Sequence, residues 1–171
     1  MVEQMQRWDT QVRDEHEALR GQVGALEAAM KADVSPQDRK VSLAWITIRA
    51  LGPSLEFHLR KEEEVLFPAL QRLLGKKGKA IEFLKQQHQE LRLALRSLAG
   101  LVCDCGCEPE ACNWKEVASA SQRFRELFEE HEKREDQLLK EALELSLKPQ
   151  ELKNLVQALN QATWTAYREE L

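Results

Sequence analysis

Apolar residues recur at intervals of three or four along four long stretches of the sequence, and no stretch shows the alternating pattern of a strand. This spacing places them on one face of an α-helix, which has to be buried against other helices. The stretches cover about residues 5–30, 41–73, 81–102 and 114–145, and most of the connections between them are short. The sequence therefore predicts an all-α fold, an antiparallel up-down four-helix bundle.

Local signals predict where these helices begin and end. Ser35 followed by Pro36 is typical of a helix start, and Asn113 with Glu116 resembles a capping box. The Gly52-Pro53 pair predicts a kink or a break in the second helix.

The predicted organisation is a bundle over residues 1–148 and a short additional helix over residues 149–171, packed on the bundle. The longest connection within the bundle is a predicted cysteine-rich loop at about residues 101–113, between the third and fourth helices. The second helix is expected to end near Gly75.

Charge and hydropathy exclude two classes of partner. The chain has 29 acidic and 25 basic residues, a net charge of −4, and no face dense in Lys and Arg, which argues against nucleic-acid binding. The N-terminus lacks the apolar core of a signal peptide, and no apolar run approaches the roughly 20 residues that span a bilayer. We therefore expect a cytoplasmic protein with no membrane partner, whose thiols are reduced by default.

The apolar residues of each predicted helix form a stripe along its buried face, and all four histidines of the chain lie on these stripes: His16, His58, His88 and His131. Two of them are followed four residues later on the same stripe by a glutamate, Glu62 and Glu135. A buried carboxylate is costly unless it is paired, protonated or bound to a metal, and no Lys or Arg lies beside these two on the stripes. A cation between the helices would supply the missing positive charge.

The spacing of these residues repeats. His16 and His58 are 42 positions apart, and His88 and His131 are 43 positions apart. The flanking segments also match, HEALR with HQELR and FHLRKEEEVL with EHEKREDQLL. This repeat indicates that the chain contains two copies of one helical hairpin. If the two copies pack about a pseudo-twofold axis, all six side chains lie at the same level along the bundle.

Six protein ligands are too many for a tetrahedral zinc site and suit a pair of six-coordinate ions. Mixed imidazole and carboxylate ligation favours iron, with manganese or zinc as alternatives. If both glutamates bridge and each ion takes two histidines, an oxo or hydroxo bridge leaves one position open on each ion. An alternative without metal, in which the polar layer serves only to specify the fold, stays open. Of the neighbouring acids, Glu15 and Glu63 are candidates to hydrogen-bond a ligand imidazole or to complete a coordination sphere.

The segments DEHEALR, EFHLRKEEEVLFPAL, QQHQELR and FEEHEKREDQLLKEAL resemble the hemerythrin-like family, also called the HHE cation-binding domain. The resemblance covers roughly residues 5–147. It implies that His16, His58, His88 and His131 are terminal iron ligands and that Glu62 and Glu135 are bridging carboxylates.

The resemblance also implies a type of function. Oxygen-carrying members have a fifth histidine one turn from the third-helix ligand, where this chain has Leu84 and Arg92. The four-His, two-Glu set is closer to members that repair iron clusters or sense iron or oxygen. We therefore expect a protein that binds or senses oxygen, nitric oxide, peroxide or iron, with a di-iron enzyme acting on peroxide or nitric oxide, or an iron-cluster-repair protein, as the alternatives.

All four cysteines lie within ten residues: Cys103, Cys105, Cys107 and Cys112. The cluster could hold a second metal ion, although Cys-x-Cys spacing is tighter than that of common zinc knuckles. It could also switch between thiols and a disulfide, or have no chemical role. These three interpretations stay open.

Overall fold

The computed structural model describes residues 2–31, 37–74, 78–144 and 150. These residues form four long helices, α1 (Val2–Lys31), α2 (Gln37–Lys61), α4 (Gly78–Cys107) and α5 (Trp114–Glu144). A π-helical turn, η1 (Glu62–Leu66), joins α2 to the shorter α3 (Phe67–Leu74), and a 3₁₀ turn, η3 (Pro109–Ala111), lies between α4 and α5. No strand occurs in the described ranges, which confirms the predicted all-α class.

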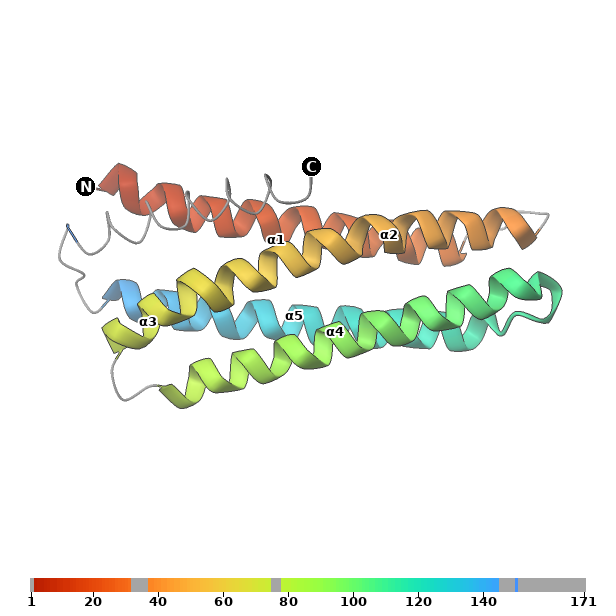
Figure 1. Cartoon of the computed structure of the whole chain (residues 1–171). Coiled ribbons are helices and arrows are strands. Elements are labelled where there is room, and N and C mark those ends of the chain that lie inside the picture. The colour runs from red at the N-terminus through yellow and green to blue at the C-terminus, as the bar shows by residue number, and fades with distance from the viewer. Residues whose placement is uncertain (1, 32–36, 75–77, 145–149, 151–171) are drawn as a thin grey trace.

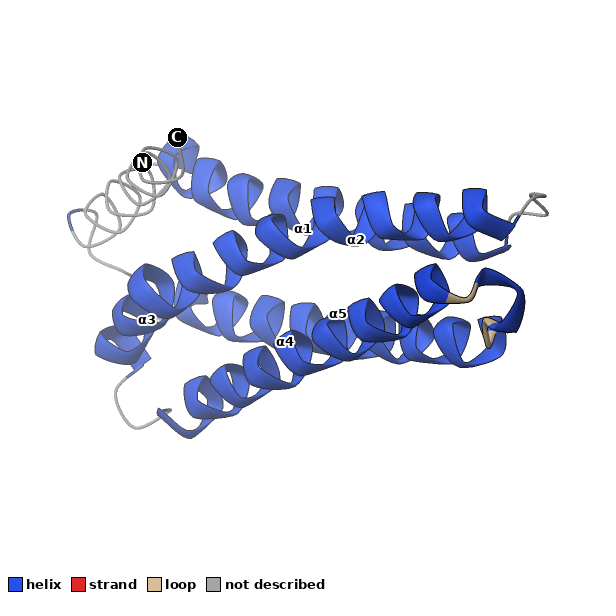
Figure 2. Ribbon diagram, turned by 45° about the vertical axis from the view of Figure 1, so that its right-hand side comes forward, coloured by secondary structure: helices blue, strands red, loops and turns tan. Residues whose placement is uncertain are grey.

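The helices form an antiparallel bundle in which each long helix packs against two others. In Figure 1, α1 and α2 run side by side in opposite directions, and α4 and α5 do the same. Contacts between α2 and α4 and between α1 and α5 close the ring. Figure 2 shows the same two pairs from another side, with the short connection between α4 and α5 at one end. The predicted up-down four-helix bundle is confirmed.

The hydrophobic core is divided into two clusters along the length of the bundle. The larger one includes Leu26, Leu51, Leu98 and Phe124 and lies toward the α4–α5 connection. The smaller one lies at the other end and is built from Val12, Leu66, Phe67, Leu70, Ile81, Leu84, Leu138 and Leu139. A layer of polar residues between these clusters forms the site described below.

The second predicted helix contains an irregular turn directly after α2, and the break that was one of the two outcomes predicted at Gly52-Pro53 does not occur. The Gly52-Pro53 pair does not break α2, which is continuous from Gln37 to Lys61. Pro53 and Arg49 are both exposed, so the carbonyl group that loses its helical partner can be hydrated. The irregular turn is instead η1, in which the backbone N–H of Phe67 donates to the carbonyl oxygen of Glu62.

This π-turn changes which residues face the core. Regular helical spacing in the predicted second helix would bury Val65 and Ala69, but both are only half-buried, whereas Leu66, Phe67 and Leu70 are fully buried. One extra residue in a helical turn rotates everything that follows it, and such turns are frequent at functional sites.

The predicted cysteine-rich loop at 101–113 is largely helical, which corrects that prediction. The helix α4 continues through Cys103 and Cys105 to Cys107 because Cys105 extends its apolar stripe and is buried among core residues. The predicted cap of α5 is confirmed, since the backbone N–H of Glu116 donates to Asn113 Oδ1 (3.4 Å) and Asn113 Nδ2 donates to Glu116 Oε2 (3.2 Å).

The predicted helix start at Ser35 and Pro36, the end near Gly75 and the C-terminal helix over 149–171 lie outside the described residues, apart from residue 150. Within the described ranges, no helix combines the length and the apolar character needed to cross a membrane.

Candidate metal centre

The six histidines and glutamates singled out from the sequence all lie in the polar layer between the two core clusters. Each long helix supplies one histidine at this level, and η1 and α5 supply the glutamates. All six side chains are buried, and Glu62 and Glu135 are only 3% and 0% exposed. The structure thus brings together residues that are up to 119 positions apart in the sequence, from His16 to Glu135.

Their ligand atoms form two overlapping groups. One group consists of His16, His58, Glu62 and Glu135, and the other of Glu62, His88 and His131; within each, the atoms lie within 4.8 Å of one another. The histidines are paired by hairpin, because the His16 and His58 rings lie 4.8 Å apart and the His88 and His131 rings 4.7 Å apart, in both cases edge to face.

Glu62 belongs to both groups because its two oxygens point at different histidine pairs. Its Oε1 lies 2.8 Å from His58 Nε2 and 3.9 Å from His16 Nε2. Its Oε2 lies 3.0 Å from His88 Nε2 and 3.5 Å from His131 Nε2. Glu135 differs, since its Oε2 lies 3.1 Å from His16 Nε2 and it belongs to the first group only. As the first residue of η1, Glu62 is aimed by the π-turn.

The hydrogen-bonding state of these atoms fits a bound cation. Both oxygens of Glu62, both oxygens of Glu135 and the Nε2 atoms of His88 and His131 are buried without a hydrogen-bond partner. The close approaches of the Glu62 and Glu135 oxygens to histidine Nε2 atoms therefore lack hydrogen-bond geometry, whereas His16 Nε2 and His58 Nε2 lie at a hydrogen-bond distance of 3.1 Å. Buried polar groups without partners are rare in native proteins, and a metal ion would satisfy these. Neutral imidazole and carboxylate are ligand types that iron accepts.

Without a metal ion, protons would balance the buried carboxylates. Burial lowers the pKa of His16, but Glu135 and Glu62 outweigh it and raise that pKa to about 9. Burial also lowers the pKa of His58, yet the charge of Glu62 and a hydrogen bond to Glu15 raise it to about 10. Burial alone would raise the pKa of Glu62, but His58, His131 and His16 bring it well below its usual value. Without a metal ion, both histidines of the first pair therefore bind protons more tightly than a free imidazole does, which offsets the charge of the buried carboxylates.

In two of the histidines, the Nδ1 atom lies at hydrogen-bond distance from a carboxylate, and that carboxylate also accepts a hydrogen bond from a Lys or Arg side chain. The Nδ1 atom of His58 lies 3.2 Å from Glu15 Oε2, and the buried Lys61 donates to the other oxygen of Glu15. The Nδ1 atom of His88 lies 2.7 Å from Glu63 Oε1.

Arg92 provides the cation behind Glu63, donating from Nη1 to the same oxygen at 2.8 Å. A proton held on Nδ1 by a carboxylate leaves the Nε2 lone pair free for a metal, and it orients the ring. Glu15 and Glu63 thus have the hydrogen-bonding role that the sequence suggested for them.

A third such arrangement was missed from the sequence. Glu132 is buried, its Oε1 lies 3.7 Å from His16 Nδ1, and Arg20 donates to both of its oxygens at 2.9 Å. The 3.7 Å separation is an ion-pair distance and too long for a hydrogen bond. The sequence did contain a signal for this arrangement. In the matched segments HEALR and HQELR, an arginine, Arg20 or Arg92, follows the histidine on the first helix of each hairpin by four residues.

The fourth histidine has no such support. His131 Nδ1 is buried without a hydrogen-bond partner, and so is Oε1 of the buried Gln87. Gln87 precedes His88 just as Glu15 precedes His16, so it occupies the equivalent position in the second hairpin. A neutral amide therefore stands where the first hairpin has a carboxylate.

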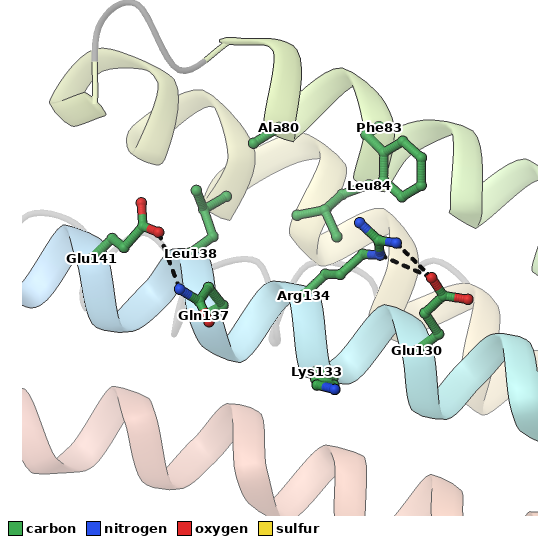
Figure 3. A pocket seen from close by; sticks show the side chains of 9 residues that line it. All are labelled: Ala80, Phe83, Leu84, Glu130, Lys133, Arg134, Gln137, Leu138 and Glu141. Atoms are coloured by element: carbon green, nitrogen blue, oxygen red, sulfur yellow. Dashed lines mark hydrogen bonds and ion pairs between the residues drawn. The ribbon is translucent and has the colours of Figure 1, made fainter.

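A surface groove of about 540 Å³ between α4 and α5 lies close to this layer but includes none of the six residues. Figure 3 shows Leu84 and Leu138 in its wall, and Arg134, which lies 4.4 Å over the ring of Phe83 and pairs with Glu130. Leu84 precedes His88 by one turn, and Leu138 follows Glu135 by one turn.

The cysteines are separated from the histidine layer and do not form a four-thiolate group. Cys105 and Cys112 are joined by a disulfide, and Cys103 and Cys107 are free and exposed. Sulfurs in a disulfide are not thiolate ligands, so the second metal ion predicted at these four cysteines would require reduction and stays a prediction. The candidate metal groups found in the described part of the chain contain no cysteine.

Comparison with known proteins agrees with this geometry. The sequence profile of the hemerythrin HHE cation-binding domain matches residues 9–143, which include all six histidines and glutamates of the layer. No curated protein and no solved structure matches the chain. The matched segment is most of the chain and spans the four-helix bundle, so this protein belongs to the hemerythrin HHE cation-binding domain family.

Proposed function

We propose that the histidine–glutamate layer holds two iron ions and that the protein binds or senses oxygen or a related small molecule such as nitric oxide or peroxide. His16 and His58 would hold one ion, and His88 and His131 the other. Glu62 would bridge them, and Glu135 lies beside the first. The observation that carries this proposal is that the two oxygens of Glu62 face separate histidine pairs at 2.8 Å and 3.0 Å.

The roles of the chain's own residues follow from their environment. The two apolar clusters on either side of the layer exclude water, which strengthens electrostatic interactions within it. Glu15 and Glu63 keep the Nδ1 proton on His58 and His88, so that Nε2 faces inward. When bound, the iron pair would supply coordination positions for a diatomic molecule or peroxide.

Metal analysis tests the proposal. After anaerobic reconstitution with ferrous iron and exposure to air, the protein should contain about two irons per chain and absorb in the near ultraviolet. Chelation should lower the midpoint of thermal unfolding, because a ligand that binds only the native state stabilises it. A fully folded protein that takes up no iron, and whose unfolding midpoint ignores both iron and chelator, would show that the layer serves only to specify the fold.

Steady-state measurements separate binding from catalysis. A binder or sensor should saturate with oxygen, nitric oxide or peroxide without turnover. Sustained consumption of peroxide or nitric oxide, abolished by Glu62→Ala, would instead favour an enzyme.

A further inference from the structure

The cysteine cluster at the far end of the bundle has an organisation that the metal centre does not use. Cys105 follows His88 by 17 residues on α4, which places the two about 25 Å apart along the helix axis. Cys105 is 5% exposed and packs within the larger core cluster, and Cys112 is half-buried against that cluster. Their disulfide fastens the last turns of α4 to the residues just before α5.

A third thiol lies at the same place. A hollow of about 410 Å³ is lined by Cys105, Cys112 and Cys107, together with the start of α5. Cys107 is exposed and free. Cys103 is exposed as well, one turn earlier on the same face of α4, but it does not line the hollow. The free thiol of Cys107 therefore lies in the same hollow as the disulfide, whereas the free thiol of Cys103 does not.

The geometry limits which sulfurs can exchange. Cys105 and Cys107 are two residues apart on a helix, so their side chains point in different directions and do not pair with each other. Cys112 follows α4 across the 3₁₀ turn and lines the hollow with both of them. Cys112 is consequently the sulfur that either of the other two can share. Of the two, only Cys107 is open to a molecule in solution.

We propose that Cys107, Cys112 and Cys105 form a thiol–disulfide relay, separate from the metal centre, that takes oxidising equivalents from small neutral or cationic disulfides. The Cys107 thiolate attacks the disulfide RSSR, so that a Cys107–SR bond forms and RS⁻ leaves. The Cys112 thiolate attacks the Cys107 sulfur, which forms Cys107–Cys112 and releases a second RS⁻. The Cys105 thiolate then attacks the Cys112 sulfur, which forms Cys105–Cys112 and restores the Cys107 thiolate.

The relay is balanced without any other reactant. Two protein thiols lose two electrons and two protons, and RSSR becomes two RSH. Cys107 is regenerated, so it governs how fast the bridge forms and is absent from the final product. Cys105 keeps the bridge because its sulfur is the least accessible to a reducing thiol.

The charge of the hollow selects the partner. Its lining includes the carboxylates of Asp104, Glu108 and Glu116 and no basic side chain. An anionic disulfide would be repelled there, and a cationic one attracted.

The rate of bridge formation tests the relay in the intact, iron-loaded protein. The protein is fully reduced, mixed with the dicationic disulfide cystamine, quenched by alkylation and mapped by mass spectrometry. We expect Cys107→Ser to slow the formation of Cys105–Cys112 about tenfold, because only slower attack through the half-buried Cys112 remains. The matched variant Cys103→Ser should react at the wild-type rate, and oxidised glutathione should react more slowly than cystamine with the wild type.

A trapping variant tests the order of the steps. Cys112→Ser should accumulate one cysteamine on Cys107 while Cys105 stays unmodified, with iron content equal to that of the wild type. Equal slowing by Cys103→Ser and Cys107→Ser, a wild-type rate in Cys107→Ser, or adducts on Cys103 alone would overturn the relay. Glutathione disulfide reacting as fast as cystamine would overturn the charge selection, and loss of iron in these variants would overturn the independence of the two sites.

Discussion

In the first helical hairpin, the imidazole of His58 is held by Glu15, and Lys61 in turn holds Glu15. In the second hairpin, the equivalent imidazole of His131 has no partner for Nδ1. The residue at the position of Glu15 is the neutral Gln87, and the residue at the position of Lys61 is Arg134, which is exposed and pairs with Glu130 instead. The two glutamates differ as well, since Glu62 reaches both histidine pairs and Glu135 is grouped with one.

The two halves therefore share their ligand-type residues but not the interactions that support them. Carboxylates behind His16, His58 and His88 increase the negative charge near those rings, whereas the Nδ1 atom of His131 has no carboxylate partner. Two ions held in this layer would experience different environments, with the ion at His88 and His131 the less strongly supported.

The largest expected effect comes from removing the two glutamates one at a time. Because Glu62 faces both histidine pairs, Glu62→Ala should reduce the iron content from about two per chain to nearly none. Glu135→Ala removes a group near the first pair only and should leave about one iron. Atomic absorption on refolded protein measures both, with helix content by circular dichroism as the control. Equal losses in the two variants would contradict the asymmetry of the bridge.

Proton binding in the metal-free protein is the next largest effect. The pKa of His16 is raised from 6.5 to about 9 and that of His58 to about 10, so both bind protons more tightly in the folded state. Their contribution to stability is fully present below pH 6.5 and is lost as the pH rises through 9 to 10, by a few kcal/mol in total.

Urea unfolding of the metal-free protein between pH 7 and 10 should show this decline. In the iron-loaded protein the decline should be absent, because metal binding has already displaced both protons. Glu15→Gln should make the decline smaller and end at a lower pH, since the hydrogen bond to Glu15 helps to raise the pKa of His58 in the folded state. A metal-free protein that gains stability over this range would refute the assigned protonation.

The smallest effect is expected from exchanging the supporting residues between the halves. Glu15→Gln makes the first hairpin resemble the second and should weaken iron retention about tenfold in competition with a chelator. Gln87→Glu makes the second hairpin resemble the first. It should strengthen iron retention by less than Glu15→Gln weakens it, because Arg134 pairs with Glu130 and no buried lysine would pair with the new carboxylate. Gln86→Glu, on the exposed neighbour, is the matched control and should change nothing. Identical effects at Glu15 and Gln87 would show that the halves are equally supported.

Much of this site was predictable from the sequence, because ligand-type residues on apolar stripes leave a clear signal. Four histidines and two glutamates at core positions, with matched spacing, predicted one converging layer, and the structure places all six there. Glu15 and Glu63 were flagged by their position beside the candidate ligands. The bundle itself followed from the period of the apolar residues.

The features that were missed depend on packing between helices or on local hydrogen bonding. The π-turn at Glu62 is invisible in a periodic pattern, whereas Gly52-Pro53 looks disruptive but faces solvent. Glu132 faces His16 across the α1–α5 contact, and no spacing within one helix reveals such a pair. The loop predicted at Cys105 is wrong because Cys105, three residues after Val102, continues the apolar face of α4 and is buried in the core.

Spin quantification tests whether the six side chains hold two ions bridged by Glu62. Electron paramagnetic resonance of the air-oxidised, iron-loaded protein should show almost no ferric signal although metal analysis finds about two irons per chain, because bridged ferric ions couple their spins. A high-spin ferric signal that accounts for all the bound iron would mean that the ions are isolated, and it would contradict the bridge.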